Sequence, residues 1–180
     1  MDWFRNDALF FEQLGIGHAH AEYVARRLRE YGLEVDVTPM EIRTDIDDRH
    51  RFKDEHDLTV GTRNRCRIDV KSRDLRFTGV HDYRYATAFV DTVSGWDAKV
   101  TPPKAIVLIS QVTRAMLVVS VKDRDCWVAK ERFDRKRRID DAYHMVATSR
   151  LRPFEALVAY LLEREVGPSG GEPGNVRLRP

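Results

Sequence analysis

The sequence of 180 residues predicts an α/β fold, a mixed β-sheet flanked by helices, in a single domain over residues 1–166. Three observations support this prediction. Segments near the two ends have the apolar spacing of amphipathic helices. Segments between residues 33 and 73 alternate apolar and polar residues, as strands buried on one face do. Two nearly continuous apolar runs, between residues 105 and 121, are typical of central strands covered on both faces.

The first helix is expected over residues 18–31, where apolar side chains recur at three- and four-residue steps. Gly32 follows at the usual place for a helix end. Residues 1–14 predict a separate short helix, because Gly15 and Gly17 interrupt the pattern between the two segments.

Strands are expected over residues 33–37, 56–61, 65–73, 105–110 and 115–121. In the strand at 65–73 the alternation is the most regular in the chain. Its apolar residues point inward to the core and its charged residues outward, the latter being Arg67, Asp69, Lys71 and Arg73.

Between and after these strands, residues 83–92 fit either a strand or a helix, and residues 126–129 predict one more short strand. The polar segment 43–55 predicts a loop. Pro153 begins a second amphipathic helix. The tail at 167–180 is rich in Gly, Pro and Ser and predicts disorder.

The overall composition argues against several classes of protein. The net charge of +2 is small, so any binding of a polyanion depends on local clusters of basic residues. Two distant cysteines argue against a disulfide framework or a zinc ribbon, and indicate a reducing, cytoplasmic setting. The sequence contains no recognisable signal peptide and no apolar run long enough to cross a bilayer, so no membrane association is expected.

Asp57 and Asp69 are the strongest candidate functional residues. Both lie on predicted neighbouring strands, and alternation places them on one face together with Lys71. Two carboxylates that converge in this way suit Mg²⁺ or Mn²⁺, with the backbone carbonyl of Val70 as a third oxygen ligand. A lysine beside such an ion is suited to contact a phosphate and the attacking water. The pattern therefore favours metal-dependent hydrolysis of phosphodiester bonds.

These residues also match a known family. Asp57, followed after eleven residues by Asp69-Val70-Lys71, resembles the PD-(D/E)xK nuclease signature, with His56 in the place of its proline and Glu22 as a further acidic member. The helix that contains Glu22, with the glycines at its ends and the strand after it, is similar to the opening of archaeal-type and phage Holliday-junction resolvases. The resemblance covers about residues 15–73.

The resemblance implies a restriction-endonuclease-like core and a magnesium-dependent deoxyribonuclease that leaves 5′-phosphate and 3′-hydroxyl ends. It implies that Asp57 and Asp69 bind the metal, that Glu22 supports it or a second ion, and that Lys71 serves the water and the phosphate. It also implies branched DNA as substrate, a role in DNA recombination and a homodimer. Some members have a glutamine after the lysine. Here Ser72 follows Lys71, and the role of Gln111, at the end of a later strand, stays open.

Two basic groups are candidate DNA contacts. One shares the face of the predicted site and consists of Arg65, Arg67 and Arg73. The other is a basic run that suits either a phosphate backbone or a charged helix face, and includes Lys130, Arg135, Lys136, Arg137 and Arg138.

Several alternatives to a branched-DNA endonuclease fit the same residues. The Asp-x-Lys tripeptide is common, and the alternative to a catalytic site is an exposed sheet face on which Asp69 pairs with Arg67 or Lys71. A DNA exonuclease, a restriction-like nuclease, or a DNA-binding module that has lost catalysis are alternatives on the same core.

Overall fold

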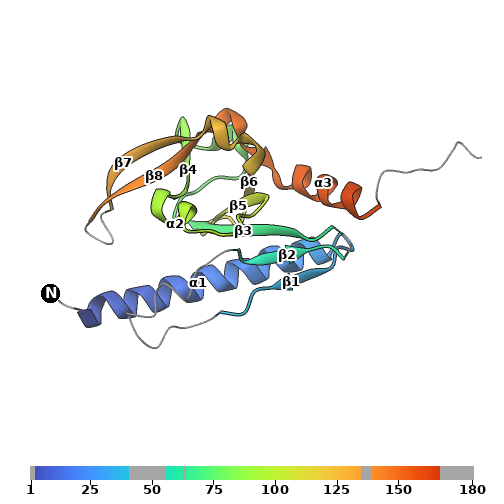
Figure 1. Ribbon diagram of the computed structural model, residues 1–180, viewed down its shortest axis with the longest axis horizontal. Helices are drawn as coiled ribbons and strands as arrows, with labels where there is room; N and C mark the ends of the chain where they lie inside the picture. The colour runs from blue at the N-terminus through green and yellow to red at the C-terminus, as the bar shows by residue number, and fades with distance from the viewer. Residues whose placement is uncertain (1–2, 41–55, 63, 135–138, 167–180) are drawn as a thin grey trace, which may run out of the picture.

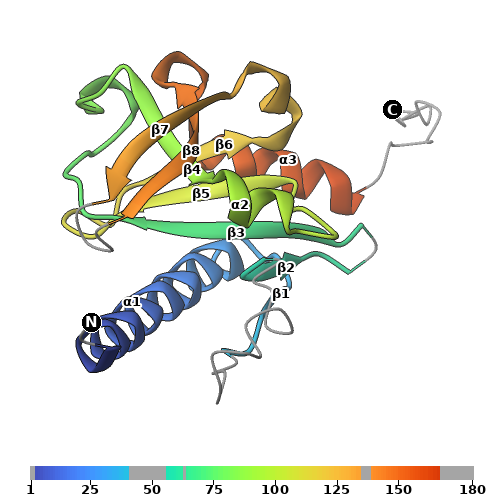
Figure 2. The same ribbon diagram turned by 60° about the vertical axis from the view of Figure 1, so that its left-hand side comes forward.

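The computed structural model describes residues 3–40, 56–62, 64–134 and 139–166. Six strands form a mixed sheet in the order β1-β2-β3-β5-β6-β9, and three further strands form a second sheet in the order β4-β8-β7. Helices α1 and α3 cover one face of the six-stranded sheet, while α2 and the second sheet cover the other (Figures 1 and 2). The predicted α/β class, a mixed sheet flanked by helices, is confirmed.

The first half of the chain contains α1 (Trp3–Arg29), β1 (Val35–Val37), β2 (Leu58–Val60), β3 (Cys66–Arg73), β4 (Thr87–Thr92) and α2 (Val93–Asp97). The second half contains β5 (Ala105–Ser110), β6 (Met116–Ser120), β7 (Val128–Asp134), β8 (Ile139–Ala147), β9 (Arg152–Pro153) and α3 (Phe154–Val166). Among the described residues, 3₁₀ helices lie at Val80–Asp82, Val121–Cys126 and Thr148–Arg150. Within these described ranges no helix is long and apolar enough to cross a membrane.

Helix α1 is continuous through Gly15 and Gly17, so the prediction of two helices was wrong. Each glycine costs about 1 kcal/mol in a helix relative to alanine. The helical turns that follow bury Ala21, Val24 and Leu28 against the sheet, and this packing outweighs that cost. The predicted stop is confirmed, because Gly32 adopts a φ of +81° just after the helix ends.

Strand β3 lies at the centre of the architecture. It pairs antiparallel with β2, with Leu58 opposite Ile68, and parallel with β5, with Asp69 beside Ile106. A parallel pair requires a long crossover, and here the crossover contains β4 and α2, which return over the sheet.

This crossover contradicts the expectation that the charged face of β3 points outward to solvent. The apolar face is correct, since Cys66, Ile68 and Val70 are buried with α1 and α3. The opposite face is also covered, because the second sheet and α2 pack on it around Trp96. Asp69 on this face is 0% exposed, and so it lies between two layers.

The second sheet settles two ambiguous segments. Residues 87–92 form strand β4, paired antiparallel with β8, and residues 130–134 belong to strand β7, not to a helix. The loop expected at 43–55 and the tail expected at 167–180 lie outside the described residues.

Candidate active site

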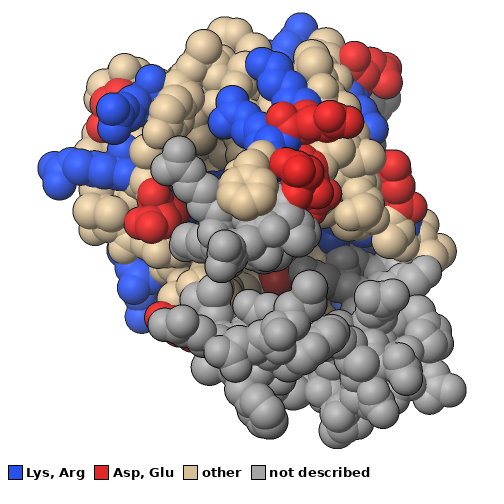
Figure 3. Space-filling model, turned by 90° about the vertical axis from the view of Figure 1, so that its left-hand side faces the viewer, with Lys and Arg blue, Asp and Glu red and all other residues tan. Residues whose placement is uncertain are grey.

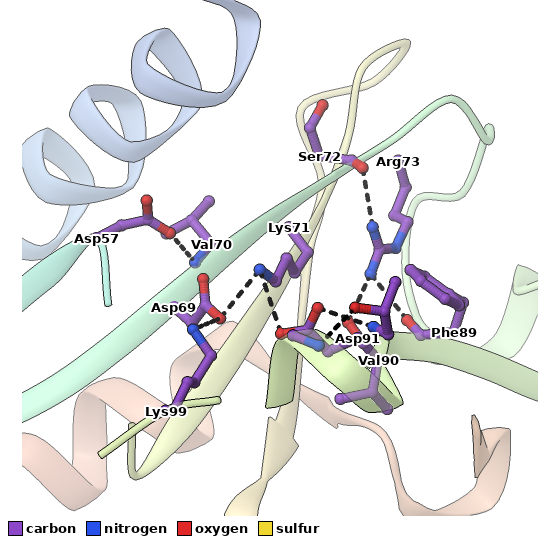
Figure 4. Close-up of polar contacts among 12 residues, drawn as sticks. Asp57, Asp69, Val70, Lys71, Ser72, Arg73, Phe89, Val90, Asp91 and Lys99 are labelled. Carbon is purple, nitrogen blue, oxygen red and sulfur yellow. Dashed lines mark hydrogen bonds and ion pairs between the residues drawn. The ribbon is translucent and has the colours of Figure 1, made fainter. Parts of the chain in front are cut away.

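Asp57 and Asp69 lie next to each other at the point where β2 begins. The backbone N–H of Asp57 donates to the carbonyl of Ile68, with a distance of 3.0 Å, and this places Asp57 beside Asp69. The Asp57 carboxylate accepts a hydrogen bond of 2.5 Å from the backbone N–H of Val70 (Figure 4). The two carboxylates predicted to converge on one site are therefore on adjacent strands and close together.

Lys71 lies between carboxylates from two different sheets. Its Nζ is 3.1 Å from Asp69 Oδ2 and 3.4 Å from Asp91 Oδ2 (Figure 4). Asp91 comes from β4, and its other oxygen, Oδ1, accepts from the N–H of Thr92. The Lys71 side chain is 18% exposed, so its ammonium group remains reachable from solvent. The Asp69–Lys71 pair expected for a simple sheet face does exist, but it is buried rather than exposed.

A second lysine approaches the same carboxylate. Lys99, in the segment after α2, places Nζ 3.4 Å from Asp69 Oδ2, and its side chain is 3% exposed. Two ammonium groups thus lie against one buried carboxylate.

The electrostatic state of Asp69 follows from these neighbours. Burial alone would raise the pKa of its carboxyl, but the positive charges of Lys71 and Lys99 outweigh burial and lower the pKa from 3.8 to about 2. Hydrogen bonding of the Asp57 and Lys71 side chains with Asp69 lowers this pKa further. Asp69 is therefore an ionised, buried carboxylate at neutral pH.

These residues fit a hard divalent cation. Asp69 Oδ2 is ion-paired with both lysines, whereas Oδ1 is buried with no hydrogen bond from the described residues, so Oδ1 retains capacity for a ligand. The N–H and C=O of a strand residue point to the same side of the strand. Because the Val70 N–H points to Asp57, the Val70 carbonyl points to that side as well. The donor set is then two carboxylates and the Val70 carbonyl. In the described ranges no three or more His, Cys, Asp or Glu side chains converge on one point. Mg²⁺ is held in proteins by one or two carboxylates and keeps several waters.

Glu22 is not brought into this cluster by a described contact. It lies on an exposed part of α1, where its Oε1 is 4.0 Å from Nε2 of His18. The buried residues His20 and Ala21 face the sheet instead. A supporting role of Glu22 for a metal stays a prediction.

Gln111 lies close to the strand that carries Lys71, although it does not follow Lys71 in sequence. Its Nε2 donates to Ser72 Oγ over 2.8 Å, and His20 Nδ1 is 2.9 Å from the same oxygen. Ser72 shares the α1 side of β3 with Val70. The hydrogen bonds among Gln111, Ser72 and His20 therefore lie on the face of β3 opposite to the one that carries Asp69 and Lys71.

Arg73 is turned into the protein, contrary to the expectation that it points outward. Its guanidinium donates to the carbonyls of Phe89 and Val90, both over 2.9 Å, and lies above the Phe89 ring. Burial lowers the pKa of Arg73 to about 10, and its positive charge still holds at neutral pH. Arg73 therefore joins the two sheets and is not presented to a ligand.

The other predicted DNA contacts are arranged differently. Arg67 is half-buried beside Thr59, Arg65 is exposed and pairs with Asp36, and Lys130 is exposed on β7. Figure 3 shows one face of the molecule. Among the described residues on that face, Lys and Arg side chains are interspersed with Asp and Glu. Arg135, Lys136, Arg137 and Arg138 lie outside the described residues.

The sequence did not identify Asp91 and Lys99 as site residues. Asp91 directly follows the apolar residues 88–90 of β4, and a buried acid after such a run is a signal for a charged partner. Lys99 carries no such signal, because it lies in an irregular segment between α2 and β5.

Comparison with known proteins gives little. No family model matches the chain, and no curated protein matches it. Among solved structures, D212, described as a nuclease from a fusselovirus, aligns over 86% of this chain and 91% of its own, with 14% identity and a TM-score of 0.40. The side chains of the site, rather than this similarity, carry the functional argument.

Proposed function

We propose that the protein is a Mg²⁺- or Mn²⁺-dependent deoxyribonuclease of the PD-(D/E)xK type that hydrolyses phosphodiester bonds in branched DNA. The observation that carries the proposal is the meeting of Asp57, Asp69 and Lys71 at adjacent positions of β2 and β3. Two acids and a lysine in this arrangement match the requirements of the reaction, namely a cation site and a positive donor next to it.

The proposed roles follow from the position of each group. Asp57, Asp69 and the Val70 carbonyl would hold the cation, which would supply positive charge beside the reacting phosphate and lower the pKa of a bound water. Lys71 donates to a non-bridging phosphate oxygen and orients the attacking water. Water adds its hydroxyl to phosphorus, the bond from phosphorus to the leaving 3′ oxygen breaks, and that oxygen takes up a proton. The products are a 5′-phosphate and a 3′-hydroxyl.

Asp91 has a positioning role in this proposal. Its carboxylate contacts the Lys71 ammonium from the side of the second sheet, whereas Asp69 contacts it from the same strand. A long lysine side chain loses considerable conformational freedom when it is fixed, and two carboxylates provide the compensating interactions. Lys71 is thereby pre-positioned for the phosphate.

One observation favours a second function. Lys71 and Lys99 both contact Asp69, so the buried carboxylate has cationic partners without a metal. This is the state expected of a DNA-binding module that has lost catalysis. Metal binding separates the two functions, because the nuclease must bind Mg²⁺ with Asp57 and Asp69 as ligands.

A panel of substrates tests the proposal. We expect the protein with Mg²⁺ to cut four-way junctions in preference to flaps, linear duplex and single strands, and to be inactive in EDTA. Preference for strand ends would favour an exonuclease, and preference for linear duplex a restriction-like nuclease. Binding without cleavage of any substrate in Mg²⁺ or Mn²⁺ would favour the non-catalytic module. Light scattering of the free and junction-bound protein tests the proposed homodimer.

A further inference from the structure

A basic pocket lies next to the carboxylate site. It has a volume of about 420 Å³, within the range of roughly 300–1,000 Å³ that is typical of small-molecule sites. Its lining residues are His56, Thr59, Arg65, Arg67, Pro102 and Lys104. We refer to this feature as the basic pocket.

Three adjacent strands build the basic pocket. Thr59 of β2 is the direct cross-strand partner of Arg67 of β3, and the N–H of Lys104, just before β5, donates to the carbonyl of Arg67 over 2.8 Å. His56 Nε2 lies 3.0 Å from Thr59 Oγ1. The basic side chains therefore come from neighbouring backbone positions whose spacing the sheet fixes.

The charges in the basic pocket are not balanced from within. None of its six lining residues is acidic. Arg65 pairs with Asp36 over 2.6 Å, but both side chains are more than half exposed, so this pair is weak. Arg67 and Lys104 form no ion pair with any residue in the part of the chain that the structure describes. Several like charges around one cavity favour the binding of an anion.

The basic pocket is aligned with the candidate active site. Arg67 and Asp69 are two residues apart on the same face of β3, which corresponds to about 7 Å along the strand. This distance is similar to the spacing between neighbouring phosphates of one nucleic-acid strand. Just before β2, the pocket residue His56 directly precedes Asp57.

We propose that the basic pocket binds the phosphodiester group next to the one that is cleaved, so that Arg67 and Lys104 set the register of the substrate strand on the active site. This inference rests on the proposed nuclease function for the identity of the strand. The volume of the pocket exceeds that of a phosphate and accommodates the attached sugar as well. Thr59 and Pro102 supply the uncharged part of the wall.

The salt dependence of binding tests the two cations. The probe is a short fluorescent single-stranded oligonucleotide, and its dissociation constant is measured in EDTA at several salt concentrations for the full-length protein. For Arg67→Gln and Lys104→Gln we expect losses of affinity on the order of tenfold each, and a salt slope that is smaller by about 0.7 for each substitution. Arg67→Lys retains the charge and should keep the slope. Arg84→Gln, at an exposed arginine outside the pocket, is the matched control and should change neither quantity.

A second measurement tests the register. Methylphosphonate linkages neutralise one phosphate of the oligonucleotide at a time. We expect one position, adjacent to the bond cut in Mg²⁺, to weaken binding to the wild-type protein but not to the Arg67→Gln/Lys104→Gln double variant. The inference is overturned if the double variant keeps the salt slope of the wild type, or if the same methylphosphonate positions weaken binding to both proteins. It is also overturned if inorganic phosphate displaces the probe equally well from the wild type and from the double variant.

The outcomes separate this inference from the proposed function. If the wild type cleaves DNA and the double variant binds and cleaves it equally well, the proposed role of the basic pocket is overturned and the proposed nuclease function stands. Pocket-dependent binding of one phosphate without cleavage of any substrate overturns the nuclease and assigns the pocket to a nucleic-acid-binding module. Absence of oligonucleotide binding by the wild type overturns the pocket.

Discussion

Lys71 of β3 and Asp91 of β4 form an ion pair, with 3.4 Å between Nζ and Oδ2, that joins the six-stranded sheet to the three-stranded sheet. Because Asp69 contacts the same ammonium over 3.1 Å, both sheets determine where Lys71 lies. The second sheet is therefore part of the candidate active site and not only a cover for the core.

Asp91→Asn should lower turnover while leaving substrate binding nearly unchanged. The amide keeps the size of the carboxylate but removes the charge that positions Lys71, so we expect kcat to fall on the order of tenfold to a hundredfold with KM unchanged. Asp97→Asn, on the exposed side of α2, is the control. A rise in KM with unchanged kcat would show that Asp91 acts on binding instead.

Asp69→Asn should destabilise the fold as well as abolish cleavage. The substitution removes the charged partner of the buried Lys99, while Lys71 keeps Asp91, and the loss of one partner of a buried pair costs about 3–5 kcal/mol. Addition of Lys99→Met should recover part of this loss, because it removes a buried ammonium group that the Asp69 carboxylate no longer stabilises. Urea denaturation of the three proteins measures the free energies of unfolding. Equal stability of Asp69→Asn and wild type would contradict the buried arrangement.

Acid should weaken the fold through the same carboxylate. The pKa of Asp69 is 3.8 in the unfolded chain and about 2 in the folded protein, so the ionised form favours folding. Its contribution, about 2 kcal/mol, is fully present above about pH 4 and is lost as the pH falls towards 2.

Denaturation at several pH values measures this loss. Asp82 titrates in the same range, because hydrogen bonds from Thr78 and Gly79 lower its pKa to about 2. The experiment is therefore performed on Asp82→Asn. The interval from roughly pH 4.5 to 2.5 follows from the two pKa values of Asp69. A free energy of unfolding that does not change over this interval would contradict a stabilising, ionised Asp69.

The glycines of α1 allow a separate test of the helix. A Cβ at Gly15 or Gly17 meets no atom within 4 Å, so alanine at either position should stabilise the protein by about 0.4–1 kcal/mol. Gly32→Ala is the contrasting variant, because its φ of +81° disfavours a side chain and the substitution should destabilise. If Gly15→Ala and Gly17→Ala destabilise, α1 is interrupted there as the sequence alone predicted.

The sequence was informative where local patterns decide the structure. Strict alternation located β2 and β3, and the continuous apolar run located β5, because side chains of a strand report which faces are covered. The same alternation misled about Asp69, since a charged residue at an outward position looks exposed until another layer is known to cover it.

What the sequence left out depends on contacts between distant segments. Asp91 and Lys99 reach Asp69 and Lys71 only because the crossover between β3 and β5 folds back over the sheet. The continuity of α1 through Gly15 likewise depends on tertiary packing, which outweighs a weak local preference.

The central claim is that Asp57 and Asp69 hold a divalent cation that is needed for cleavage. It is tested most directly by single-turnover cleavage of a four-way junction by the wild type and by Asp57→Asn, each with Mg²⁺ and with EDTA. The amide still accepts the hydrogen bond from Val70, so the variant should stay folded and bind the junction. We predict cleavage by the wild type in Mg²⁺ alone and none by the variant. Equal cleavage by both proteins, or cleavage that persists in EDTA, would contradict the account.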